Sequence, residues 1–250
     1  MKTSILSCFR ARRPSRAVCQ HLLSSAAAVV LLSGCAADYV DIDRTLPPYF
    51  HAQNVFIHTE GLDAMPRRIL VLPCWGDAPA KTLRDIDEVL WQEFGKANVA
   101  ELVVPPREST INRRSEQEFT LDEARKWAHK AGAEGVLTCR VTSCSPHRPI
   151  ALGVALRIWS LPKDTTVWAV DETLDSQLTL VANGARNYYL TEFRAPYPAR
   201  RSEAILESPR MFFQYVFAEL FITLPGKAPG TVPERGLFPP PERAEGGKKR

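Results

Sequence analysis

Three strand-like stretches follow one another without a helical pattern between them, and this arrangement most constrains the fold. They cover 135–144, 150–161 and 165–174. In the middle stretch, Leu152, Val154 and Leu156 alternate with smaller or polar residues, the period of two that is typical of a strand with unequal faces. The connections between the stretches are only a few residues long. We therefore expect three neighbouring antiparallel strands.

Two further strands and a helix are expected upstream. The continuous apolar run 69–72 ends at Pro73 and predicts a strand that is buried on both faces, in the middle of the sheet. A second strand is expected over 99–104, before two prolines. Between them, residues 80–97 predict an amphipathic helix, because apolar residues recur at spacings of three and four: Leu83, Ile86, Val89, Leu90 and Phe94.

A second helix is expected after residue 120. Thr120 and Glu123 have the spacing of a capping box, in which each side chain bonds the backbone of the other, and Gly132 is suited to end the helix. The order of elements is then β-α-β-α-β-β-β. This order predicts an α/β (α+β) fold with a mixed sheet and helices packed on it.

The region after the third antiparallel strand is expected to be helical. Residues 178–189 carry a helical apolar stripe, although Asn183-Gly184 equally suggests a hairpin turn. A long C-terminal helix is predicted from about Ser202 to Leu224, with a wide apolar face. Residues 225–250 contain six Pro and five Gly, a composition typical of a disordered tail.

The N-terminus has the pattern of an export signal. Five basic and no acidic residues lie in the first part, and the apolar run 22–32 is too short to span a bilayer. Leu32-Ser33-Gly34-Cys35 follows and resembles the lipobox of bacterial prolipoproteins. The resemblance implies cleavage of a signal peptide at 1–34 and a membrane anchor through lipid on Cys35. Ala36 is not the aspartate that retains enterobacterial lipoproteins at the inner membrane, which favours the outer membrane, facing the periplasm.

The expected domains are the lipidated N-terminus and tether over 35–66, the α/β domain over 67–224 and the tail over 225–250. Removal of the signal leaves 27 of the 32 Lys and Arg against 28 Asp and Glu, so the mature chain is almost neutral. A neutral chain gives no electrostatic reason to expect nucleic acid as a partner.

Three cysteines remain in the α/β domain. Cys139 and Cys144 are an odd number of residues apart on one predicted strand, so they are expected on opposite faces and too far apart to be bridged. A disulfide of Cys74 with Cys139 or Cys144 is therefore the candidate pairing. The alternative is that all three are thiols that act as small apolar side chains.

Motifs for catalysis, metal binding and phosphate binding are absent from the sequence: it contains no H-E-x-x-H, C-x-x-C, G-x-S-x-G or P-loop. We expect no catalytic or metal-binding residue and no cofactor. Cys74, Trp75 and Asp77 follow the first buried strand, where a partner surface or a ligand pocket commonly lies. Trp159 and Trp168 are expected to form a cross-strand pair.

Several segments resemble the α/β domain of a group of envelope lipoproteins. They are 69–73, the run from Ala131 to Leu137, the run from Leu156 to Leu161, and Val167-Trp168. The group includes the curli-secretion lipoprotein, the lipoprotein activators of penicillin-binding proteins and the N-terminal domain of TolB. The resemblance implies a non-catalytic role in binding or assembly of envelope proteins. The alternative is a lipoprotein that binds a small molecule or a glycan, with a hydrolase as the third candidate.

Overall fold

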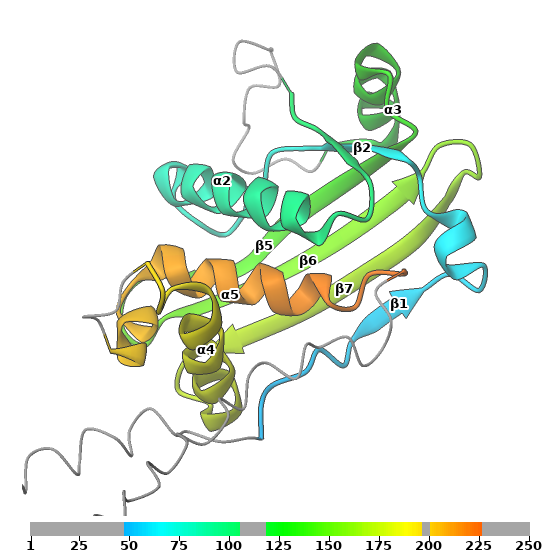
Figure 1. Ribbon diagram of the computed structural model, residues 1–250. Coiled ribbons are helices and arrows are strands. Elements are labelled where there is room, and N and C mark those ends of the chain that lie inside the picture. Colours follow the sequence, from blue (N-terminus) through cyan, green and yellow to red (C-terminus); the bar gives the residue numbers. More distant parts are fainter. Residues whose placement is uncertain (1–47, 106–118, 197–200, 227–250) are drawn as a thin grey trace, which may run out of the picture. The chain divides into compact units, whose positions relative to one another are not determined.

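A mixed seven-stranded sheet organises the part of the chain that the computed structural model describes, namely residues 48–105, 119–196 and 201–226 (Figure 1). The predicted signal peptide, Cys35 and most of the predicted tail lie outside these residues. The strands are β1 (Val55–Ile57), β2 (Arg68–Val71), β3 (Trp75–Gly76), β4 (Glu101–Val103), β5 (Gly135–Ser145), β6 (Ala151–Ser160) and β7 (Thr165–Asp175).

The strand order is β1-β7-β6-β5-β2-β4, and β3 pairs with β5 beyond the end of β2. β2 is parallel to both of its neighbours, β4 and β5, whereas β5, β6, β7 and β1 are antiparallel. Side chains of β2 are buried on both sides: Ile69 belongs to a large apolar cluster and Leu70 to a small one on the opposite face. The expectations of a buried inner strand and of three antiparallel neighbours are confirmed.

A β-bulge overturns the expected placement of two cysteines. The register of β5 and β6 shifts between Val141 and Ser143, so that Cys139 pairs with Leu156 and Cys144 with Leu152. Leu152 and Leu156 lie on the same face of β6, and both cysteines contact the large apolar cluster. The extra residue of the bulge cancels the odd spacing, which is why the prediction of opposite faces was wrong.

A second irregularity separates the two tryptophans that were expected to pair. Ile158 is opposite Trp168, but Trp159 is opposite Thr166, because β7 has one extra residue at this point. Trp168 is fully buried in the large cluster, and its indole N–H donates to the Thr223 hydroxyl at 3.1 Å. Trp159, one residue beyond Ile158, lies on the other face. The predicted cross-strand pair is therefore wrong.

Four α-helices pack on the sheet in the described part of the chain: α2 (Ala80–Ala97), α3 (Leu121–Ala131), α4 (Thr179–Glu192) and α5 (Pro209–Phe221). The predicted capping box begins α3: the Glu123 N–H donates to the Thr120 hydroxyl, and the Thr120 N–H donates to the Glu123 carboxylate. Gly132 ends the helix with a φ of 64°. Two short 3-10 helices, η2 (Gly61–Ala64) and η3 (Ser202–Leu206), complete the elements.

Asn183 and Gly184 lie inside α4, so the helix prediction holds and the alternative of a hairpin turn is wrong. A Cβ at position 184 would lie 2.3 Å from the hydroxyl oxygen of Tyr215 on α5. Gly184 thus allows α5 to approach α4 closely. This contact explains why Gly184, a residue type that otherwise favours turns, lies inside a helix. No local pattern in the sequence indicates the contact.

The long C-terminal helix is not confirmed. The segment is divided into η3 and the 13-residue α5, with Ser208 in an extended conformation between them. Pro209 disfavours helical geometry at the residue before it and lacks the N–H that a continuous helix would need. It is tolerated because it lies at the first position of α5, where that N–H has no helical partner.

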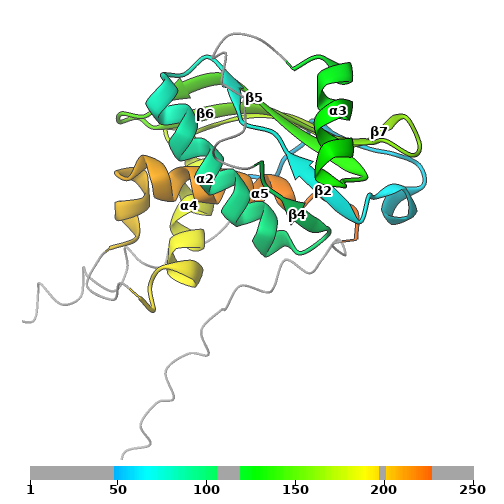
Figure 2. The ribbon, with the colours of Figure 1, turned by 90° about the horizontal axis from the view of Figure 1, so that it is seen from above.

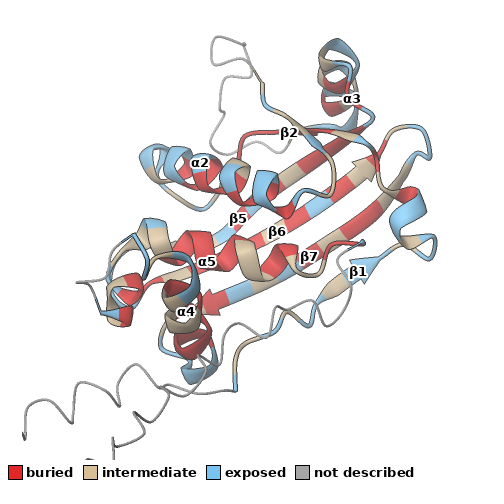
Figure 3. Ribbon diagram, viewed as in Figure 1, coloured by how far each residue is buried: buried red, intermediate tan, exposed pale blue. Residues whose placement is uncertain are grey.

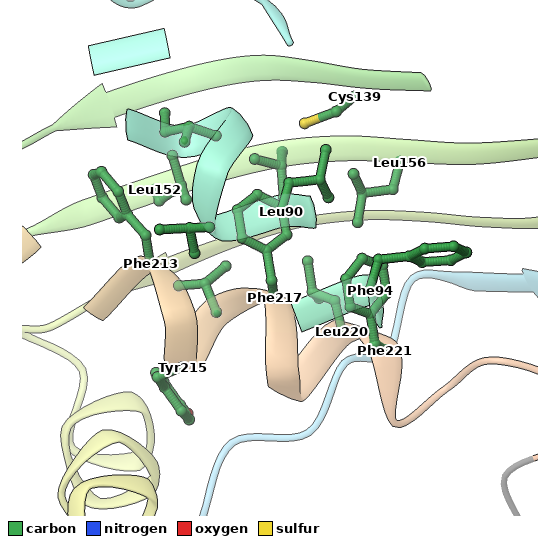
Figure 4. Close-up of a cluster of buried hydrophobic side chains, with 14 of the residues drawn as sticks. Leu90, Phe94, Cys139, Leu152, Leu156, Phe213, Tyr215, Phe217, Leu220 and Phe221 are labelled. Carbon is green, nitrogen blue, oxygen red and sulfur yellow. The ribbon is translucent and has the colours of Figure 1, made fainter. Parts of the chain in front are cut away.

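The large apolar cluster lies between the sheet and helices α2, α4 and α5. Figure 4 shows Phe213, Phe217 and Phe221 of α5 facing Leu90 and Phe94 of α2 beneath the strands. Aromatic rings are in contact throughout, with ring centres 5.5 Å apart for Phe94 and Phe221 and 6.1 Å apart for Phe217 and Phe221.

Residues 48–66, which belong to the predicted tether, contribute β1 and η2 to this body. Val55–Ile57 extends the sheet beyond β7, in antiparallel register from Val55 opposite Val170 to Ile57 opposite Trp168. Glu172 supports the strand, because its carboxylate accepts the backbone N–H groups of Gln53 and Asn54 at 2.6 and 2.8 Å.

Candidate binding surface

The two faces of the sheet are covered unequally. Helices α4 and α5 lie together on one side of strands β5, β6 and β7 (Figure 2). On the other side, α3 covers only β2 and the beginning of β5, through a small cluster that includes Leu70, Ala128 and Val136. The later part of β5, together with β6 and β7, has no described helix over this side. Arg140, Arg157 and Asp171 are accordingly exposed there.

A groove with a volume of about 300 Å³ runs over this open face. Its residues come from five strands or their ends, which are far apart in sequence and adjacent only in the folded sheet. They are Asn54, Phe56, Trp75, Thr138, Arg140, Ala155, Leu156, Arg157, Ala169, Val170 and Asp171. We call this set the open-face groove.

The register arranges these side chains in two rows. In the first row, Trp75 is next to Arg140, Arg140 is opposite Ala155, and Ala155 is opposite Asp171. In the second row, Thr138 is opposite Arg157, Arg157 is opposite Ala169, and Ala169 is opposite Phe56. Each row therefore has an alanine beside an arginine, so that a small side chain forms the floor and larger side chains form the rim.

The rim combines aromatic and charged groups. Phe56 is 50% exposed, whereas Trp75 is 6% exposed and packs edge-to-face on Phe119 with ring centres 5.8 Å apart. Among the described residues, no ion pair engages the guanidinium groups of Arg140 and Arg157. Two positive donors and one carboxylate, Asp171, thus face the groove and are available to a bound partner.

The predicted site residues Cys74, Trp75 and Asp77 point to three different places. The Cys74 side chain lies in the large apolar cluster, and its backbone N–H donates to the buried Asp87 carboxylate at 2.7 Å. Trp75 lines the groove. Asp77 is exposed, and its backbone N–H donates to the Val141 carbonyl at 2.9 Å. The structure does not join the three into one pocket.

The short strand β3 explains this divergence. A Cβ on Gly76 would lie 2.1 Å from the Val141 carbonyl oxygen, and the Gly76 φ of 122° is one that L side chains rarely adopt. Glycine therefore lets the chain run against β5 after Pro73. Successive residues of this strand face opposite sides, which turns Cys74 inward and Trp75 toward the groove.

No disulfide joins the three cysteines in the described structure, in which Cys74 and Cys139 are buried and Cys144 is half-buried. Burial, with a smaller contribution from the negative charge of Asp77, raises the pKa of Cys144 to about 11. The Cys144 thiol is therefore protonated at neutral pH and a poor nucleophile. The bridge of Cys74 with either partner stays a prediction.

In the described residues, no cluster of three or more His, Cys, Asp or Glu is arranged to hold a metal ion. The Nδ1 atom of His51 lies 3.2 Å from a carboxylate oxygen of Glu219 on α5. Within the same residues, no helix is both long enough and apolar enough to cross a membrane.

Most residues of the open-face groove were not predicted from the sequence. The alternation in β6 is its only local signal, because Ala155 and Arg157 occupy the positions between the large aliphatic residues. The contributions of Asn54, Phe56 and Asp171 depend on strand register across the sheet. Such register is set by bulges and by distant pairing, which a single sequence does not display.

No protein-family model matches the chain, and no curated protein matches it. Solved structures that are similar include the PelC dodecamer from Paraburkholderia phytofirmans, with 10% identity, a TM-score of 0.37 and coverage of 68% of this chain and 93% of that one. The lipoprotein GNA1162 from Neisseria meningitidis is 15% identical, with a TM-score of 0.32 and coverage of 44% and 81%.

The C-terminal domain of LpoB from Salmonella enterica is also similar, at 12% identity and a TM-score of 0.28, with coverage of 43% of this chain and 81% of that one. All three TM-scores are below 0.5, so they give no support to any particular partner or activity of this chain.

Proposed function

We propose that this protein is a lipid-anchored, non-catalytic binding protein of the bacterial cell envelope. Cys35 carries the lipid, and the open-face groove binds a segment of another envelope protein. The observation that carries the proposal is the unequal coverage of the sheet: helices seal one face of β5, β6 and β7, while a groove with aromatic and charged rims crosses the other.

The shape of the groove favours an extended peptide segment. Pockets for small molecules enclose most of the ligand surface, whereas this groove lies on a sheet face with no described element above β6 and β7. Ala155 and Ala169 leave room for a side chain of the partner, and Arg140 and Arg157 favour a partner that presents acidic or backbone carbonyl groups.

The chemistry of the groove supports binding more than catalysis. Asp171 is the one carboxylate among its described lining residues, and no His or Cys lies among them. An activated nucleophile commonly lies within hydrogen-bond reach of a general base, and Asp171 is the one candidate base in the described lining. The alternative, a small-molecule or glycan ligand, would use the same Phe56 ring and the same Asp171 carboxylate.

Photo-crosslinking in cells tests the proposal. A photoreactive amino acid at Ala155 or Ala169 is expected to form an adduct with one envelope protein, identified by mass spectrometry. Ala218 is a matched control, because it is a half-buried alanine on α5, on the helix-covered side of the sheet. Ala155→Arg is expected to abolish the adduct at position 169 by filling the groove.

Equal adducts from Ala155 and Ala218, or an adduct at position 169 that survives Ala155→Arg, would exclude the groove as the binding surface. An adduct of low mass, without protein, would favour the small-molecule or glycan alternative. The anchor is tested separately by the mass of the mature N-terminal peptide, which should begin at an acylated Cys35. Membrane fractionation then tests the proposed outer-membrane location.

A further inference from the structure

Two exposed leucines lie at the beginning of α4. Leu178 is 55% exposed and Leu180 is 43% exposed, although α4 is buried from Val181 to Ala185. Figure 3 shows this change from exposed to buried along the helix. The sequence from Ser176 to Ala185 contains no charged residue, in contrast to the charged rim of the open-face groove.

The described chain begins beside these leucines. The Phe50 backbone N–H donates to the Leu180 carbonyl at 3.1 Å, and Phe50 packs against the large apolar cluster. Tyr49 and Phe50 are both half-buried. The first residues of the body are therefore fixed against the first turn of α4, as Figure 1 also shows.

When Cys35 carries lipid, the position of this junction sets how far α4 can lie from the bilayer. The chain from Cys35 to Pro48 spans at most about 45 Å, so the bilayer surface is never far from α4. A tethered contact is an intramolecular one, and its effective concentration makes even a weak apolar contact populated. Tyrosine is enriched at membrane interfaces, because its ring is apolar and its hydroxyl is polar.

We propose that Leu178, Leu180 and Tyr49 form a membrane-docking patch, which inserts shallowly into the surface of the bilayer that holds the Cys35 lipid. This inference rests on the proposed anchoring at Cys35. The absence of charge between Ser176 and Ala185 suits a lipid surface. The patch also fixes which part of the body faces the membrane.

A photoreactive amino acid at position 180 of the full lipidated protein, in vesicles of the phospholipids of the native membrane, tests the patch. Lipid adducts are expected from position 180 and not from position 121. Leu121 is the matched control, since it is a leucine that is 41% exposed at the beginning of another helix, α3. Leu178→Ser is expected to lower the adduct yield at position 180 about fivefold, the effect of losing half of one leucine contact.

Equal lipid adducts from positions 180 and 121, or no lipid adduct above background at position 180, would overturn the patch. The mass of the N-terminal peptide is measured in the same samples. An acylated Cys35 without lipid adducts at position 180 refutes only the docking patch, whereas a Cys35 without lipid refutes the anchoring and the patch with it.

Discussion

The two sides of strand β6 differ in what surrounds them, although they belong to the same ten residues. On one side, Leu152, Val154 and Ile158 are fully buried beneath α2 and α5. On the other, Ala155 and Arg157 line an open groove. Alternate residues of one strand therefore serve stability and recognition, and substitutions at adjacent positions should have separable effects.

The largest expected effect is on the covered side. Ile158→Ala should lower the free energy of unfolding by about 2–5 kcal/mol, because it removes a buried side chain and leaves a cavity beside Trp168. Arg157→Ala, one residue along and exposed, should change it by less than about 0.5 kcal/mol. Chemical denaturation of both variants measures the difference.

In a binding assay, the two variants should show the opposite order of effects. Arg157→Ala should weaken crosslinking at the open-face groove, while any Ile158→Ala molecules that remain folded should crosslink normally, because Ile158 is not among the groove residues. Similar losses of stability from both variants would show that the open side is as tightly packed as the covered one, and the comparison would fail.

A smaller effect is expected where two helices meet on the covered side. Gly184→Ala should destabilise the protein by about 1–3 kcal/mol, because its methyl group would lie 2.3 Å from the Tyr215 hydroxyl oxygen. Tyr215→Phe in the same molecule should restore part of the loss, since the next ring atom is 3.0 Å away. Thermal denaturation of the single and double variants checks this coupling.

Ala155→Val is the control for that experiment. It adds two methyl groups to the floor of the open-face groove, where solvent can be displaced, and should leave the midpoint of thermal denaturation almost unchanged. If Ala155→Val destabilises the protein as much as Gly184→Ala, the groove is closed by packing that the described residues do not provide.

The smallest effect depends on pH. Burial raises the pKa of Glu93 on α2, although Lys96 and Tyr188, which contact its carboxylate at 2.8 and 3.3 Å, oppose this shift. The folded state therefore holds the proton more tightly than the unfolded state. The contribution of Glu93 to stability is fully present below about pH 4 and is lost as pH rises through the raised pKa.

Glu93→Gln should remove this loss, because the amide stays neutral at every pH. The variant should gain stability relative to the parent protein between pH 4 and neutral pH, by less than about 1 kcal/mol. Denaturation curves recorded at several pH values measure the trend. A gain that decreases with rising pH would contradict the raised pKa.

Periodic patterns predicted the main elements well. The helix at 80–97 agrees with the structure at both ends, and the capping box at Thr120 correctly placed the beginning of α3. Both depend on contacts within a few residues, so the local sequence contains them. The break before α5 also has a local signal in the sequence, Pro209. The long apolar pattern around it favoured a continuous helix instead.

The candidate site was less predictable, because it depends on contacts between distant strands. Trp75 was identified from its place after a buried strand, and it does line the open-face groove. Phe56 reaches the groove only through the pairing of β1 with β7, and Arg157 through its register with Thr138. Each bulge changes which side chains share a face, so an error of one residue moves a side chain to the wrong environment.

The two edge strands of the sheet are very short. β1 and β4 each have three residues, and β4 is followed closely by Pro105, which has no N–H to offer a further strand. Few backbone groups are left for another chain to pair with in register. Many copies at high local concentration should therefore resist sheet-to-sheet aggregation, and the protein should stay dispersed at the concentrations reached during overproduction.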